Sequence, residues 1–147
     1  MENVTEEVAK QLLTFRLAEE SYGVDILRVK EIRGWAPVTA IPEAPHFILG
    51  MLNLRGAIVP VIDMRSRFGL APATPTPVTV IIVLSTTRND GSAREFGVVV
   101  DSVSEVVQLD AAKQIPDRLG SECLSGLMEH QDELVKVLDV KQVMNGH

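Results

Sequence analysis

Residues 59–64 read VPVIDM and residues 135–140 read VKVLDV, so a strand-like run that ends in aspartate occurs twice in this chain. The same shift of 76 residues aligns GML at 50–52 with GLM at 126–128. A shift of 74 residues aligns YGV at 22–24 with FGV at 96–98, and EI at 31–32 with EV at 105–106. Because the matches keep their order and spacing, the sequence indicates an internal duplication.

Alternation of apolar and polar residues runs through both copies and is typical of strands with one buried face. Residues 80–84, VIIVL, are a β-branched run typical of a strand that is buried on both faces. Residues 71–77, APATPTP, alternate proline with small residues and cannot supply a full strand ladder. We therefore expect two lobes, residues 11–70 and 78–147, joined by a crossover at 71–77 and preceded by a flexible segment at 1–10.

Short strands whose edges must be closed favour small barrels, so the expected fold class is all-β with short helical segments. Turn-forming residues separate the strands at 20–21, 55–56, 89–91 and 131–132. Asp63 and Asp139 each follow a strand and precede helical spacing, which predicts two helix N-caps. The pattern predicts one core with Phe15, Val24, Ile26, Val59 and Val61, and another with Val98, Val100, Val135 and Val137.

Composition narrows the class of function. The chain has 147 residues, 46% of them apolar, which is enough for a sizeable core, and its 20 acidic and 14 basic residues give a net charge of -6. No basic run is present to bind nucleic acid or anionic lipid. The first residues lack a targeting pattern, and no apolar run approaches the roughly 18 residues of a membrane span, so we expect a cytoplasmic protein. Cys123 is the single cysteine, and we expect it to be a small buried side chain.

The sequence favours a binding protein over an enzyme. Gly50 and Gly56 have five residues between them and are followed by Ala57, which does not fit a phosphate-binding loop. The three histidines are far apart in sequence, and no Cys/His spacing suits a metal, so we expect no cofactor. The scattered acidic residues are expected to be solvated, namely Asp101, Asp110, Glu122, Glu129, Asp132 and Glu133.

The duplication also distinguishes residues that both copies share from residues that only one copy has. Glu31 matches Glu105, so each of them either has a structural role, such as pairing with a neighbouring base or capping a turn, or takes part in binding. Arg55 has no counterpart, because the equivalent turn carries Gln131 and Asp132; it is either a solvated turn residue or an anchor for a partner. Trp35 is also unmatched, and both core packing and partner anchoring remain open for it.

Read in order, YGVDILRVKEIRG at 22–34, GMLNLRGAIVPVIDMRSRFGL at 50–70 and FGVVVDSVSEV at 96–106 resemble the CheW family. The resemblance covers about residues 12–144, and NLRG followed by the Pro-x-x-Asp-x-Arg of residues 60–65 is its specific signal. It implies two five-stranded SH3-like barrels, no cofactor, and a non-enzymatic chemotaxis adaptor. A small-barrel peptide-binding module outside chemosensing is the alternative, although only 4% of the residues are aromatic.

Partners follow from the same resemblance. It implies binding to the cytoplasmic hairpin tip of chemoreceptors and to the regulatory domain of a CheA-type histidine kinase, with recruitment to membrane-associated receptor arrays. By position, the implied receptor-binding residues are Val29, Glu31, Gly50 and Arg55. Asn53 and Gly56 are expected to shape the turn that presents Arg55.

Overall fold

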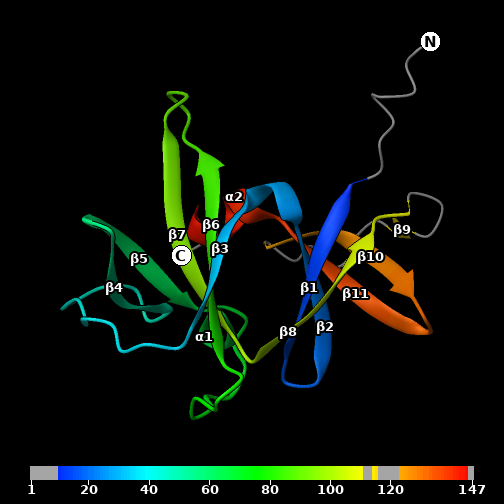
Figure 1. Ribbon diagram of the computed structural model, residues 1–147, viewed down its shortest axis with the longest axis horizontal. Helices are drawn as coiled ribbons and strands as arrows, with labels where there is room; N and C mark the ends of the chain where they lie inside the picture. Colours follow the sequence, from blue (N-terminus) through cyan, green and yellow to red (C-terminus); the bar gives the residue numbers. More distant parts are fainter. Residues whose placement is uncertain (1–9, 111–113, 116–122, 146–147) are drawn as a thin grey trace.

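The computed structural model describes residues 10–110, 114–115 and 123–145, and most of them lie in strands (Figure 1). The first sequence copy forms β1 (Gln11–Leu17), β2 (Glu20–Asp25), β3 (Val29–Gly34), β4 (Ile48–Leu54), β5 (Ala57–Asp63) and helix α1 (Met64–Arg67). The second copy forms β6 (Val80–Thr87), β7 (Ala93–Val100), β8 (Ser102–Gln108), β9 (Gln114–Ile115), β10 (Leu124–His130), β11 (Glu133–Leu138) and helix α2 (Val140–Asn145). A short 3-10 helix, η2 (Ile26–Arg28), separates β2 from β3.

The strands form two sheets, with orders β8-β1-β2-β11-β10-β9 and β3-β6-β7-β5-β4. We call the first barrel 1 and the second barrel 2, because each closes on itself. In barrel 2, Thr39 lies just beyond β3 and exchanges two backbone hydrogen bonds with Met51 of β4, at 3.0 and 2.8 Å. In barrel 1, β9 follows β8 along the chain and pairs with β10. The predicted small-barrel fold is confirmed.

Each barrel combines strands from both sequence copies. Barrel 1 takes the hairpin β1–β2 from the first copy, and barrel 2 takes the hairpin β6–β7 from the second. The exchange is reciprocal down to single residues: Val61 of β5 lies opposite Gly97 of β7, and the equivalent Val137 of β11 lies opposite Gly23 of β2. The predicted lobes, residues 11–70 and 78–147, therefore differ from the barrels that the structure contains. Because the two copies have matching strands, the strand patterns alone do not show which hairpin completes which barrel.

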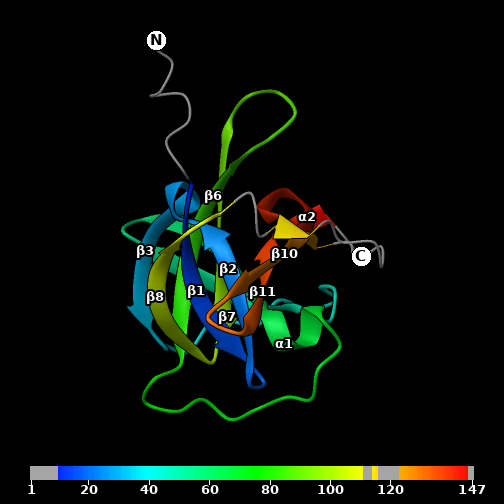
Figure 2. The same ribbon diagram turned by 90° about the vertical axis from the view of Figure 1, so that its right-hand side faces the viewer.

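The chain passes between the barrels at two short connections. One is η2, between β2 and β3, and the other is Asp101, between β7 and β8. The crossover at 71–77 instead links α1 to β6, and so stays with barrel 2; Figure 2 shows it as a long green loop. Of the segment expected to be flexible, residues 1–9 lie outside the described residues.

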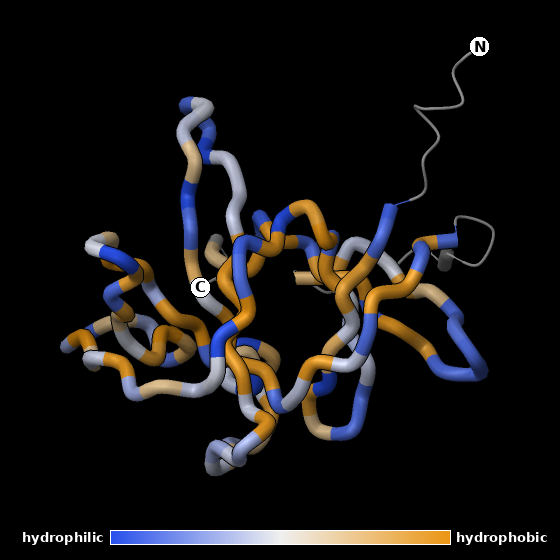
Figure 3. Tube along the Cα trace, viewed as in Figure 1, coloured by the Kyte–Doolittle hydropathy of each residue, from blue (hydrophilic) through white to orange (hydrophobic). Residues whose placement is uncertain are grey.

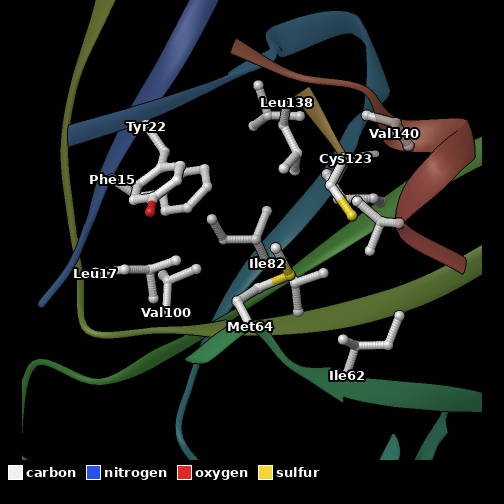
Figure 4. Packing of buried hydrophobic residues seen from close by; sticks show 14 of the residues in the cluster. Phe15, Leu17, Tyr22, Ile62, Met64, Ile82, Val100, Cys123, Leu138 and Val140 are labelled. Carbon is white, nitrogen blue, oxygen red and sulfur yellow. The ribbon is translucent and has the colours of Figure 1, made fainter. Parts of the chain in front are cut away.

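The largest core cluster joins the two barrels. Phe15, Leu17 and Tyr22 of barrel 1 share it with Ile82 of barrel 2 and with Met64 of α1, which follows β5, as Figure 4 shows. Figure 3 shows hydrophobic residues concentrated where the strands converge. The residues predicted for the cores are buried, apart from the partly buried Ile26. Their predicted grouping was wrong, because exchange of the hairpins places four of them in one shared cluster, namely Phe15, Val24, Val98 and Val100.

Most of the predictions about single turns and caps agree with the structure. Asp63 caps α1, since its Oδ1 accepts a hydrogen bond from the Arg65 amide at 3.0 Å. The turn at 131–132 has positive φ at both residues, as a tight hairpin turn requires. The turn predicted at Glu20 and Ser21 lies instead at 18–19, because Glu20 already pairs with Leu17 in the β1–β2 ladder. Cys123 is buried, with 2% of its surface exposed.

Asp101 is not a solvated surface residue as expected, because it holds the junction of the barrels together. Its two carboxylate oxygens accept hydrogen bonds from Nε and Nη2 of Arg65, at 3.0 and 2.7 Å. Oδ2 also accepts from the Ala18 amide at 2.9 Å, at the β1–β2 turn. Arg65 Nη1 donates to the Ala71 carbonyl at 2.8 Å, which ties the crossover to the same point. The hydrogen bonds from Arg65 are the main cause of a lowered pKa for the Asp101 carboxyl group.

Replacing Asp101 by asparagine is expected to reduce the free energy of unfolding by about 1 to 2 kcal/mol at neutral pH. The expected loss is smaller than the largest values found for hydrogen bonds to charged groups, because the Asp101 side chain is 32% exposed and solvent screens the ion pair. Since the folded pKa is lower than the unfolded value of about 4, the stabilisation exists above pH 4 and disappears as the pH falls through the folded pKa. Urea unfolding of both proteins over an acid pH series measures this difference.

Asp132→Asn is the matched control for the Asp101 experiment. Asp132 is exposed at a hairpin turn with positive φ, which asparagine also tolerates, so we expect less than about 0.5 kcal/mol of change. An Asp101→Asn difference that persists unchanged at low pH would show that the ion pair is not the source of the stability.

Candidate functional site

The β4–β5 turn presents Arg55 to solvent. Arg55 has φ +51° and Gly56 has φ +90°, the left-handed conformations that a two-residue hairpin turn needs. The Asn53 side chain accepts a hydrogen bond from the Gly56 amide at 3.0 Å, and this bond fixes the turn. The Arg55 side chain remains 74% exposed, so its guanidinium group is available to a partner.

Glu31 holds the Arg55 side chain from the neighbouring strand β3. Arg55 Nη2 donates to Glu31 Oε1 at 2.6 Å, and Arg33 Nη1 donates to Glu31 Oε2 at 3.2 Å. The hydrogen bond from Arg55 is the main cause of a lowered pKa for Glu31, and the same bond raises the pKa of Arg55. Closure of barrel 2 brings these residues together, since β3 and β4 lie at opposite edges of the open strand order. The result is a fixed guanidinium group with free N–H donors.

Val29 and Gly50 contribute to the same barrel in other ways. Val29 begins β3 opposite Leu84 and is partly buried against the main core, and a bulge separates it from Glu31. Gly50 is buried in β4, where an added Cβ would meet the backbone carbonyl group of Thr39. Gly50 therefore permits the close approach that closes the barrel.

Among the described residues, barrel 1 has no copy of this arginine–glutamate pair. Glu105, the equivalent of Glu31, lies 3.7 Å from His130 Nε2, measured from its Oε2. The equivalent of Arg55 is Gln131, whose φ is also +51°. The two barrels thus share the turn geometry and the glutamate, whereas the arginine is present only in barrel 2.

Both barrels expose apolar side chains at equivalent positions, which the sequence interpretation did not identify. Ile32 and Val106 match, with 45% and 49% exposure, and Ile58 and Leu134 match, with 57% and 48% exposure. The sequence did contain a signal for them, because the residue at each of these positions is apolar in both copies of the duplication.

Trp35, the other candidate anchor, packs against a cluster that contains Leu54, Val59, Ile81 and Val83. In the part of the chain that the structure describes, every helix is too short or too polar to cross a membrane.

Comparison with known proteins agrees with this arrangement. The CheW-like domain family model matches residues 11–147. The chemotaxis protein CheW of Klebsiella aerogenes is 40% identical over 145 residues, which cover 95% of this chain and 84% of that protein. The probable chemotaxis protein CheW of Rhizobium etli is 43% identical over 98 residues, or 67% of this chain and 60% of that protein.

A solved structure shares the fold. The crystal structure of the scaffolding protein TtCheW from Thermoanaerobacter tengcongensis matches with a TM-score of 0.80 and 32% identity, over 90% of each chain. The family model, the Klebsiella aerogenes relative and this structure each match nearly the whole chain. The chain belongs to the CheW-like domain family.

Proposed function

We propose that this chain is a non-enzymatic chemotaxis adaptor that couples chemoreceptor cytoplasmic tips to a CheA-type histidine kinase. The observation that carries the proposal is the Arg55 guanidinium group, held at an exposed hairpin turn by Glu31 in a chain of the CheW-like family. The names of the similar chemotaxis and scaffolding proteins support the same role. They do not favour a peptide-binding module outside chemosensing.

The receptor-binding surface is proposed to centre on Arg55 and Glu31. One nitrogen of Arg55 bonds to Glu31, and the planar guanidinium group keeps other N–H donors for the receptor. The hydrogen bond restricts the side chain before binding, which reduces the conformational entropy lost on association. Val29 is proposed to add apolar contact, and Gly50 to keep β4 in place behind the turn.

The kinase is proposed to bind through the matched apolar residues, Ile32 and Ile58 on barrel 2 and Val106 and Leu134 on barrel 1. A regulatory domain that also has two barrels can place its barrel 1 on barrel 2 of the adaptor, or the reverse. Such contacts leave one end of each molecule free, so adaptor and kinase domains can alternate in an array at the cytoplasmic face of the membrane. Each contact is expected to be weak, with attachment strengthened by multivalency.

Replacing Arg55 by alanine is expected to weaken binding to a receptor-tip fragment by about 2 kcal/mol, or roughly thirtyfold. The melting temperature should stay within a few degrees of wild type, because the side chain is 74% exposed and exposed ion pairs stabilise proteins little. Pull-down titration with the fragment and thermal unfolding measure the two quantities.

Gln131→Ala is the matched control, since Gln131 occupies the equivalent turn position of barrel 1 with the same φ. It should change neither binding nor stability. A Glu31→Ala variant and the double variant then test coupling: if Glu31 acts through Arg55, the two losses of binding free energy are not additive. Unchanged receptor binding by Arg55→Ala would reduce Arg55 to a turn residue and remove the main support for the proposed function.

A further inference from the structure

The β6–β7 hairpin extends past barrel 2, and the face that it turns toward the core changes character along its length. Near the barrel, Leu84 and Phe96 lie opposite each other and are fully buried in the main core. One step further along the same face, Thr86 lies opposite Arg94. Figure 1 shows the hairpin projecting beyond the other strands, and Figure 3 shows its outer part as hydrophilic. The outer part of this face therefore presents polar and cationic side chains.

Two adjoining pockets lie against this face. One has a volume of about 180 Å³ and is lined by residues that include Thr86, Arg88, Arg94 and Lys141. The other has a volume of about 270 Å³ and extends toward β1, η2 and the start of α2. They share the lining residues Thr86 and Lys141, so they adjoin, and we call the two together the cationic groove.

The cationic groove is unusual in a chain with a net charge of -6. Its walls carry five cationic side chains, namely Lys10, Arg28, Arg88, Arg94 and Lys141. Arg88 is occupied by hydrogen bonds to Ser92 and Ala93 of its own hairpin. Among the described residues, no carboxylate group forms an ion pair with Arg28, Arg94 or Lys141. These cations therefore remain available to an anionic partner.

The half of the groove nearest β1 is mixed in chemistry. Leu12, Leu109 and Val140 give it apolar walls, and Asp25 and Asp139 add two carboxylates. Asp25 accepts a hydrogen bond from the Leu27 amide and caps η2. A compact polyphosphate would be repelled by the carboxylates in this half, and its binding requires donors that converge on one point. The cations here are instead distributed along the groove, with Lys10 just before β1 and the others on η2, on α2 and on the β6–β7 hairpin.

We infer that the cationic groove binds an acidic segment of a partner protein in extended conformation, with an apolar side chain in the half near Leu109 and carboxylates at Arg94 and Lys141. Spaced carboxylates match spaced cations, and the apolar walls give the segment an anchor that charge alone does not supply. The groove shares no lining residue with the Glu31 and Arg55 surface, so this inference is independent of the proposed receptor contact.

The test uses a fluorescein-labelled peptide, Gly-Glu-Leu-Glu-Glu-Leu-Glu-Gly, titrated with the full chain at low ionic strength and followed by anisotropy. Two companion peptides replace every glutamate by glutamine or every leucine by serine. The protein variants are Arg94→Glu and Lys141→Glu, with Lys30→Glu as the control, because Lys30 is an exposed cation on β3 that lines neither pocket. Arg55→Ala is the second control and should bind the peptide like wild type.

We expect the acidic peptide to bind, and each groove variant to weaken it about tenfold, while Lys30→Glu has little effect. Both companion peptides should bind more weakly, and added salt should reduce binding of the acidic peptide. Lys141 is exposed, so its variant gives an answer even if Arg94→Glu fails to fold. Equal binding of the glutamine peptide, equal weakening by Lys30→Glu, or equally strong competition by inorganic tripolyphosphate would each overturn the inference.

Discussion

Replacing Val61 by aspartate is expected to lower the free energy of unfolding by about 4 kcal/mol or more, a large part of the total stability of a domain of this size. Val61 is fully buried on β5, where β5 pairs in parallel with β7 across the two sequence copies. The small Gly97 lies directly opposite, and the side chains nearest to it are those of Ile81 and Val61. A carboxylate there has no partner, so it must either remain charged without solvent or take up a proton at a cost in free energy.

Urea unfolding followed by circular dichroism measures the loss for Val61→Asp. Ile58→Asp is the matched control, because Ile58 lies on the same strand and is 57% exposed. The control should change the free energy of unfolding by less than about 1 kcal/mol. Similar losses for the two variants would contradict the burial of Val61 at the junction between β5 and β7.

Replacing Gly50 by alanine is expected to cost on the order of 3 kcal/mol, although the change adds one methyl group. The new Cβ would overlap the Thr39 carbonyl group, and it would lie 2.8 Å from the Thr39 carbonyl carbon and from Cγ2 of Val38. Backbone cannot move aside as a flexible side chain can. The chain beyond β3 must therefore shift, and the two hydrogen bonds between Thr39 and Met51 that close barrel 2 are lost.

Gly34→Ala is the control for this experiment. Gly34 ends β3, its conformation is not left-handed, and no atom lies within 4 Å of an added Cβ. Alanine should be neutral or slightly stabilising there, since it reduces the entropy of the unfolded chain. Thermal unfolding compares the variants. If Gly50→Ala is as stable as Gly34→Ala, yet loses receptor binding, Gly50 contacts the receptor directly and its role in closing the barrel is minor.

The sequence alone determined the local features of this protein. Alternating apolar residues define the strands, and the buried run in β6 is recognisable because both of its faces are apolar. The cap at Asp63 and the turn at Arg55 and Gly56 depend on backbone conformation over a few residues, which side-chain type controls directly. The duplication is also readable, because equivalent strands require equivalent patterns. The all-β class and the barrels followed from these features.

Only the tertiary structure decided which hairpin completes which barrel and which charged residues meet. The two hairpins have matching strand patterns, so the patterns do not show which hairpin completes which barrel, and the chain changes barrel at η2 and at Asp101. The same exchange and closure bring Arg55 to Glu31 and Arg65 to Asp101, which are 24 and 36 residues apart in sequence. Ion pairs over such separations leave no periodic pattern, because the position of each partner is set by the packing of whole strands and not by its neighbours in the chain.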